Sequence, residues 1–120
     1  MNFTNLIPSV FYTDISEGLK LFVDCLQFTI THKDLNTLQP YCVLKKDGIS
    51  LMLFQDEQLA KEHNPELRLA TDNIEEVYEK VSRTHPHLLH PNLNKVTLRP
   101  WGAKEFAIAD NQLGIRFQQW

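Results

Sequence analysis

The sequence contains few of the residues on which phosphate, redox and zinc sites depend. Its 120 residues include four glycines, none of them adjacent, so no glycine-rich loop is available to wrap a phosphate group with backbone amides. The two cysteines, Cys25 and Cys42, have no zinc or redox spacing and are too few for a disulfide framework. We therefore expect two free, mostly buried thiols and no phosphate-binding loop.

An excess of positive charge and long apolar runs are also missing. Lysine and arginine number 12 against 15 acidic residues, and the formal net charge is −3, so the chain lacks the basic surface that nucleic-acid binding requires. No apolar run approaches the length of a membrane span, and the first residues do not read as a secretion signal. We expect a single-domain cytoplasmic protein with no nucleic-acid or membrane partner.

Two helix-opening signals lie about half a chain length apart. Asp14 and Asp72 each have the place of a helix N-cap, and Glu17 and Glu75 follow three residues later, which is a capping box in acidic form. Apolar residues at helical spacing come after each signal; they are Ile15, Leu19, Phe22, Val23 and Leu26 in the first half and Ile74, Val77, Tyr78 and Val81 in the second. A signal repeated in this way predicts two copies of one supersecondary unit.

Short extended runs surround both predicted helices. They cover 6–12, 28–32, 41–45 and 49–54 in the first half, and 67–71, 96–98, 105–109 and 114–117 in the second. Asp47-Gly48 suits a tight hairpin turn, and Pro8 requires an edge or unpaired position in its strand. Each half reads β-α-β-β-β. We predict an α+β fold with modules at residues 1–55 and 66–120, joined by a linker or solvated helical turn at residues 56–65.

Two motifs resemble those of a known family. The run from Tyr12-Thr13-Asp14-Ile15 to Phe28 is similar to the opening of a module in the glyoxalase/bleomycin resistance/dioxygenase (vicinal oxygen chelate) superfamily, with Gln27 in place of the usual glycine. The run from Pro100-Trp101-Gly102 to Glu105-Phe106 resembles a segment of the bleomycin-resistance branch. The resemblance covers nearly the whole chain. It implies tandem β-α-β-β-β modules that form a curved mixed sheet around a cleft, and a homodimer whose ligand clefts form between subunits.

The resemblance also implies where a divalent metal would bind. Enzymes of the superfamily hold it with His, Glu or Gln on the first and last strands of each module, and the matching positions here are Ile7, Met52, Glu66 and either Arg116 or Phe117. Only Glu66 is able to coordinate a hard cation. We therefore expect neither a cofactor nor catalysis by the metal-dependent mechanism. The alternative is a divergent lyase, isomerase or dioxygenase with a metal held by Glu66 and a histidine such as His90.

The histidines of the second half are better explained as part of a solvated connector than as a metal site. His85, His87 and His90 lie close together, and histidine is a common metal ligand. Pro86 interrupts them, however, and the segment contains no cysteine or acidic residue. We interpret it as a solvated connector.

Aromatic side chains remain as the strongest candidates for a binding site. Flat rings bind planar or cationic groups by stacking and by quadrupole attraction. Trp101 follows a proline and precedes a glycine, which is typical of an exposed loop, whereas Phe54, Phe106 and Phe117 are each as well explained as core. The candidate ligand-binding residues are Trp101, Phe54, Tyr41, Glu105, Phe106 and Arg116.

The leading hypothesis is a metal-independent binding protein of the bleomycin-resistance type. It would sequester a planar or cationic small molecule in a dimer cleft, without breaking a bond. A third hypothesis is a dimeric regulatory or interaction domain whose cleft is filled by Met52 and Phe117.

Overall fold

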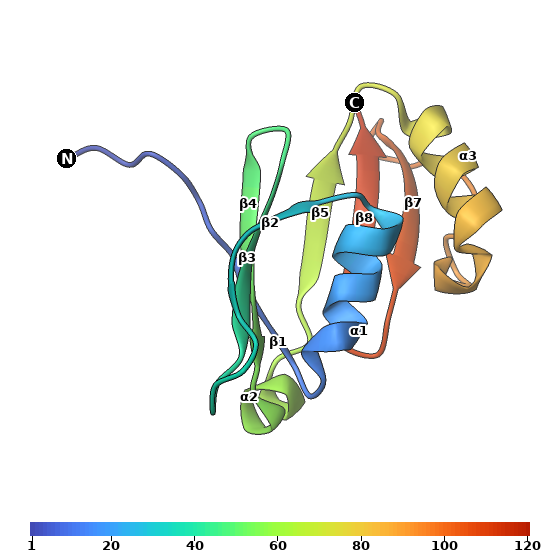
Figure 1. Ribbon diagram of the computed structural model, residues 1–120. Helices are drawn as coiled ribbons and strands as arrows, with labels where there is room; N and C mark the ends of the chain where they lie inside the picture. The colour runs from blue at the N-terminus through green and yellow to red at the C-terminus, as the bar shows by residue number, and fades with distance from the viewer. The chain divides into compact units, whose positions relative to one another are not determined.

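The computed structural model describes all residues, 1–120, and the chain divides into two units, Met1–His63 and Asn64–Trp120 (Figure 1). Each unit contains one mixed four-stranded sheet. The first unit consists of β1 (Ser9–Tyr12), α1 (Ile15–Leu19) continued by a π-helix (Lys20–Cys25), β2 (Thr29–Asp34), β3 (Tyr41–Lys46), β4 (Ile49–Gln55) and α2 (Glu57–Glu62). The second consists of β5 (Glu66–Ala70), α3 (Ile74–Thr84), a 3₁₀ turn (Pro86–Leu88), β6 (Thr97–Leu98), β7 (Lys104–Ala109) and β8 (Gly114–Gln119).

The two sheets have the same topology. Their strand orders are β1-β4-β3-β2 and β5-β8-β7-β6. The pairs β1/β4 and β5/β8 are parallel, and the other neighbouring pairs are antiparallel. The predicted α+β class and the repeated β-α-β-β-β order are therefore confirmed.

The short helix α2 occupies the predicted linker. Its N-cap is Asp56, whose carboxylate accepts a hydrogen bond from the Leu59 N–H at 3.0 Å.

The start of each long helix depends on a capping side chain. Asp14 caps α1 by accepting from the Ser16 N–H at 2.9 Å, and hydrogen bonds from Ser16 hold the pKa of Asp14 below its ordinary value. In the second unit the predicted cap, Asp72, is wrong by one residue. Asn73 is the N-cap and accepts from the Glu76 N–H at 3.3 Å. The Thr71 hydroxyl holds the Asn73 N–H at 3.2 Å, so the chain bends once more before the helix begins.

A glutamine at the end of the last strand of each sheet also holds the first helical residue. The Gln55 Oε1 accepts from the Ile15 N–H at 3.0 Å, and the Gln119 Oε1 accepts from the Ile74 N–H at 2.9 Å. These N–H groups have no partner inside their own helices. The same solution in both units is further evidence of the duplication.

Alternation along the strands gives each sheet one apolar face packed against its helix. In the first unit that face carries Val10, Cys42, Leu44, Leu51 and Leu53, and in the second it carries Phe106, Ile108, Ile115 and Phe117, all of them buried. Both cysteines are free and buried, as predicted. We call the other side of each sheet its helix-distal face. Side chains two residues apart share it, and it is where candidate functional groups gather.

Two turns of the first unit use left-handed backbone. Asp47 and Gly48 have φ of 51° and 81°, which is the tight hairpin predicted between β3 and β4. Gln27 has φ of 65° and follows Leu26, the C-cap of the π-helix, at a position where glycine is the usual residue.

We predict that Gln27→Gly stabilises the protein. A non-glycine residue in this conformation costs roughly 1 kcal/mol, and glycine has no Cβ to strain, so the free energy of unfolding should rise by about 0.5–1 kcal/mol in urea titrations. The control is Gln39→Gly, at an exposed glutamine without positive φ, which should lower stability by increasing the entropy of the unfolded chain. Equal effects of the two substitutions would contradict the assignment of strain to Gln27.

Candidate functional site: a charged network and an aromatic cluster

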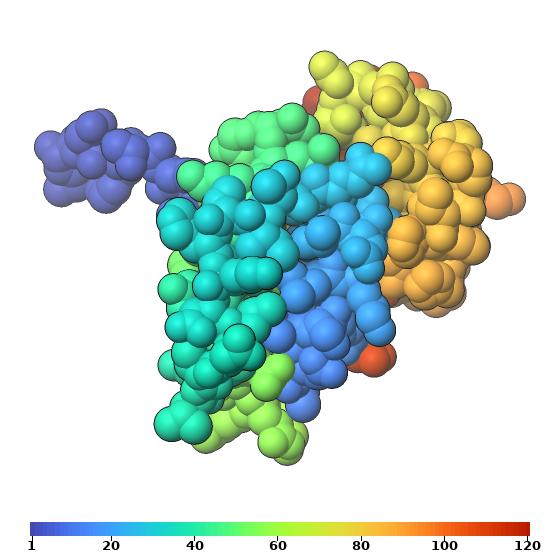
Figure 2. Space-filling view, in the orientation of Figure 1, coloured from blue at the N-terminus to red at the C-terminus, as the bar shows by residue number.

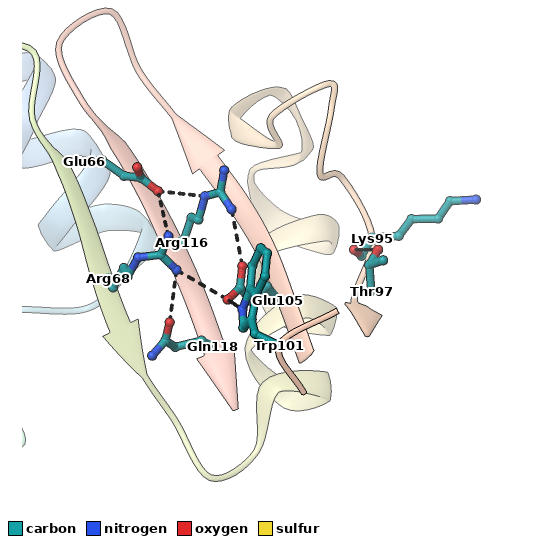
Figure 3. A network of polar contacts seen from close by, with 8 residues as sticks. All are labelled: Glu66, Arg68, Lys95, Thr97, Trp101, Glu105, Arg116 and Gln118. Atoms are coloured by element: carbon teal, nitrogen blue, oxygen red, sulfur yellow. Dashed lines mark hydrogen bonds and ion pairs between the residues drawn. The ribbon is translucent and has the colours of Figure 1, made fainter. Parts of the chain in front are cut away.

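The helix-distal face of the second sheet carries a network of charged side chains (Figure 3). The register places Arg68 beside Arg116, and it places Gln118 beside Glu105. Two-residue spacing brings Glu66 onto the same face as Arg68. Three neighbouring strands, β5, β8 and β7, therefore contribute to one site.

Glu105 is the buried centre of this network. Its side chain is 0% exposed. Its Oε1 lies 3.4 Å from Arg116 Nη1, and its Oε2 lies 3.3 Å from Arg68 Nη1. The indole N–H of Trp101 donates to Oε2 at 2.9 Å. A carboxylate removed from water needs opposite charge and hydrogen-bond donors, and Glu105 has both.

Glu66 closes the network at its exposed side. Its Oε1 lies 2.7 Å from Arg116 Nε and 3.7 Å from Arg68 Nη2, so each arginine bridges the two glutamates. Arg68 also donates from Nη1 to the Gln118 Oε1 at 3.2 Å. The four charges alternate in sign and cancel. The guanidinium groups are consequently held in fixed directions while keeping part of their surface in solvent.

Trp101 is fixed by contacts on its edge and on its face. Besides the hydrogen bond to Glu105, the guanidinium carbon of Arg99 lies 4.9 Å from the centre of the ring, a cation–π contact. The loop is tight, because the Arg99 N–H donates to the Ala103 carbonyl at 2.8 Å and Gly102 takes φ of 100°. Trp101 nevertheless remains 47% exposed. Its indole is therefore held in one position while about half of its surface stays accessible.

An aromatic cluster occupies the helix-distal face of the first sheet. Phe54 of β4 lies between Phe11 of β1 and Tyr41 of β3, with ring centroids 5.6 Å and 6.4 Å apart respectively. All three rings are partly exposed. Sequence reasoning selected Tyr41 and Phe54 but missed Phe11, which its alternation with the buried Val10 and Tyr12 was able to reveal.

The sequence-selected residues thus separate into three groups. Glu105, Arg116 and Trp101 meet in the charged network, and Tyr41 and Phe54 meet in the aromatic cluster. Phe106 joins neither group, because it points to the opposite face of its sheet. It is fully buried, with its ring centroid 4.7 Å from that of Phe117 and 5.1 Å from that of Tyr78.

The two helix-distal faces occupy equivalent strands but differ in chemistry. In the first sheet Phe54 is paired with Phe11 and Tyr41, whereas in the second its counterpart Gln118 is paired with Ala70 and Glu105. The duplicated scaffold therefore presents aromatic rings in one unit and fixed charges in the other.

The residues of the charged network do not fit a divalent metal. Arg116, rather than the core residue Phe117, lies on the face of Glu66, and the only carboxylates there are already bound to guanidinium groups. A cation at Glu66 would have to displace or face two arginines. Nowhere in the chain do three His, Cys, Asp or Glu side chains gather in a group able to hold a metal ion. His85 precedes the 3₁₀ turn and His87 lies within it, with ring centroids 5.8 Å apart.

Solved structures share this architecture along almost the entire chain. A bleomycin-binding protein from Streptomyces verticillus, complexed with copper(II)-bleomycin, has a TM-score of 0.73 at 18% identity, covering 98% of this chain and 96% of that one. TioX from Micromonospora sp. ML1 has a TM-score of 0.77 at 12% identity, covering 97% and 98%. A member of the glyoxalase/bleomycin resistance protein/dioxygenase superfamily from Sphaerobacter thermophilus has a TM-score of 0.71 at 14% identity, covering 98% of both chains.

The chain has the glyoxalase/bleomycin resistance fold. The similarity lies in the fold, since the sequence matches no protein-family model and no curated protein. No helix in the structure has the length and apolar character needed to cross a membrane. Within this fold, the charged network and the aromatic cluster distinguish the two units.

We predict that Glu105→Gln lowers the free energy of unfolding by about 1–3 kcal/mol in urea titrations. The substitution leaves the two guanidinium groups and the Trp101 N–H with a poorer acceptor in a buried place. The control is Glu75→Gln in the same unit, because Glu75 pairs with Lys104 at 3.5 Å while both side chains remain about half exposed. That change should stay within about 0.5 kcal/mol. An equally small effect at Glu105 would show that the network is not structurally important.

Proposed function

We propose that this protein is a metal-independent small-molecule binding protein of the bleomycin-resistance type. It sequesters a planar or cationic ligand in a cleft that two copies of the chain form together, and it breaks no bond. The observation that carries the proposal is the fixed, half-exposed indole of Trp101, held by a fully buried carboxylate on a helix-distal face.

The aromatic groups match the chemistry of such a ligand. Phe11, Phe54 and Tyr41 present three neighbouring rings, and Trp101 presents a fourth on the other unit. Ring faces attract planar groups by stacking and cations through the ring quadrupole. Because the indole and the guanidinium groups are already held in place, little conformational entropy is lost when a ligand binds.

The side chains offer little support for catalysis. Glu66 and Glu105 are each bound to two guanidinium groups, which makes them poor metal ligands. The thiols of Cys25 and Cys42 are buried, and burial raises the pKa of Cys42, so its reactive thiolate form is disfavoured. Binding without reaction is the function that these groups support best.

The shared fold supports the choice of ligand class. Similar structures include a bleomycin-binding protein complexed with bleomycin and another complexed with copper(II)-bleomycin. The proposal takes from them the kind of activity, capture of a small molecule, and leaves the identity of the molecule open.

The first residues support a second copy of the chain as the partner. Met1, Phe3 and Leu6 have exposed fractions of 111%, 83% and 82%, and their segment extends away from the rest of its unit (Figure 2). Three large apolar side chains in water favour burial against another surface. A homodimer provides that surface and completes the proposed cleft.

Binding of a planar cation should depend on the ring at position 54 and not on metal. Proflavine is a suitable probe, with its own fluorescence as the signal and EDTA present throughout. Phe54→Leu should weaken binding about two- to tenfold, because one aromatic contact is lost while apolar volume is kept. Phe54→Tyr retains the ring and should retain the affinity. Binding that appears only when EDTA is replaced by Mn²⁺, Fe²⁺, Ni²⁺ or Zn²⁺ would instead support a metal-dependent enzyme.

Dimerisation should depend on the exposed apolar residues near the start of the chain. The double variant Phe3→Asp/Leu6→Asp should weaken the dimer at least tenfold in sedimentation equilibrium, since burying each large apolar side chain contributes roughly 1.5–3 kcal/mol. Leu38→Asp is the control, because Leu38 is 107% exposed in the loop before β3. A wild-type protein that is monomeric at all concentrations would overturn the homodimer.

A further inference from the structure

The second unit contains a cavity of about 340 Å³ beside the charged network. Its lining includes the apolar side chains of Leu93 and Ala107, and it also touches Ile108 and Ile115, whose buried side chains point to the helix-facing side of the sheet. The polar residues of the lining are Arg99, Arg116, Glu66, His90 and Asn92. The cavity is at the small end of ligand pockets, which run from about 300 to 1,000 Å³.

The wall formed by residues 90–93 is fixed to the sheet. The His90 N–H donates to the Ala107 carbonyl at 2.9 Å, and the Ala107 N–H donates to the Leu93 carbonyl at 2.9 Å, so the segment runs along β7. The Nδ1 atom of His90 accepts from the Asn92 N–H at 3.1 Å. With Nδ1 occupied as an acceptor, the neutral ring carries its proton on Nε2 and is a donor there.

Arg99 brings a positive charge to the cavity without a carboxylate to neutralise it. The other three arginines of the chain, Arg68, Arg83 and Arg116, each form an ion pair with a glutamate. Arg99 forms none and instead lies over the Trp101 ring. Its Nε is buried and has no hydrogen-bond partner.

An unpaired buried donor is costly, and native structures rarely leave one without a reason. With Glu66, Glu105, Arg68 and Arg116 cancelling in charge, Arg99 leaves the cavity region with one positive charge in excess. An oxygen acceptor that carries one negative charge would satisfy this donor and balance this charge.

We infer that this cavity binds the carboxylate group of a small organic acid. Arg99 is the charge partner of the carboxylate, and His90 contributes a further donor. Leu93 and Ala107 contact the body of the acid. The inference rests on the proposed function and deepens it, because it assigns an acidic group to the planar ligand that the protein captures.

The charges of the cavity disfavour the opposite kind of ligand. A cation would meet Arg99 and Arg116, and the one carboxylate of the lining, that of Glu66, is already 2.7 Å from Arg116 Nε (Figure 3). A phosphate dianion would exceed the single uncompensated charge. A monoanion is therefore the best match.

The test uses three probes with one planar body: 2-naphthoate, 2-naphthol and 2-naphthylmethylammonium. Isothermal titration calorimetry of the intact protein should show that naphthoate binds at least tenfold more tightly than the neutral or cationic probe, and that added salt weakens it. Arg99→Gln should remove most of that preference, on the order of tenfold in affinity.

Arg83→Gln is the matched control. It also removes one positive charge from the second unit, but Arg83 lies on α3, pairs with the exposed Glu79 and does not line the cavity. Naphthoate affinity should not change in this variant. Thermal unfolding of Arg99→Gln checks its fold, and only a small loss of stability is expected, because Arg99 has no carboxylate partner and loses only the cation–π contact with the half-exposed Trp101 ring.

Two results would overturn the inference, and they differ in what they say about the proposed function. Equal binding of the three naphthyl probes, unaffected by Arg99→Gln, would refute the carboxylate site while leaving capture of planar molecules intact. Failure of naphthoate, the other naphthyl probes and proflavine to bind at all would refute both.

Discussion

The buried carboxylate of Glu105 is the interaction on which the rest of the site depends. It lies within a sheet face without access to solvent, and it is tolerated there because two guanidinium groups and an indole N–H surround it. Each of these partners is a long or bulky side chain that would otherwise adopt several rotamers. By ordering them, one glutamate fixes the direction of Arg68, Arg116 and Trp101 at once. The half-exposed outer parts of these groups are thus pre-organised, as a binding site requires.

Duplication of one unit gave this chain two faces with separate chemistry. Backbone topology, helix placement and the glutamine that holds the helix start are the same in both halves. Equivalent strand positions carry Phe11, Tyr41 and Phe54 in one and Ala70, Glu105 and Gln118 in the other. The core-facing positions stayed apolar in both units because packing against a helix permits little else. The helix-distal positions were free of that constraint and diverged.

Local patterns made most of the fold predictable. The class and the order of elements follow from signals that involve only residues close together in the sequence. These signals are the helix caps, the helical spacing, the Asp47-Gly48 turn and the strand alternation. The cap of α3 was misplaced by one residue, because the Thr71 hydroxyl bond that delays the helix is one of several local bonds that an Asp-Asn sequence allows. The π-helical continuation of α1 has no sequence signal that we can name.

The candidate site was less predictable, because it depends on register between distant strands. Glu105 and Arg116 were selected, but Arg68 becomes their partner only through the pairing of β5 with β8. Phe106 has the same composition cue as Phe54, and only the side of the sheet to which each points separates a core residue from a candidate ligand contact. Register likewise decides which of Arg116 and Phe117 shares the sheet face of Glu66.

The glutamine at the end of each sheet has a consequence for the order in which the protein acquires structure. Ile15 and Gln55 are 40 positions apart, and Ile74 and Gln119 are 45 apart. During synthesis the beginning of each long helix therefore emerges well before the side chain that satisfies its first amide. Until the last strand arrives, that helix end can be served only by water and local caps. This hydrogen bond between the helix start and the strand end therefore forms late in each unit, and a nascent chain that ends before Gln55 or Gln119 lacks it.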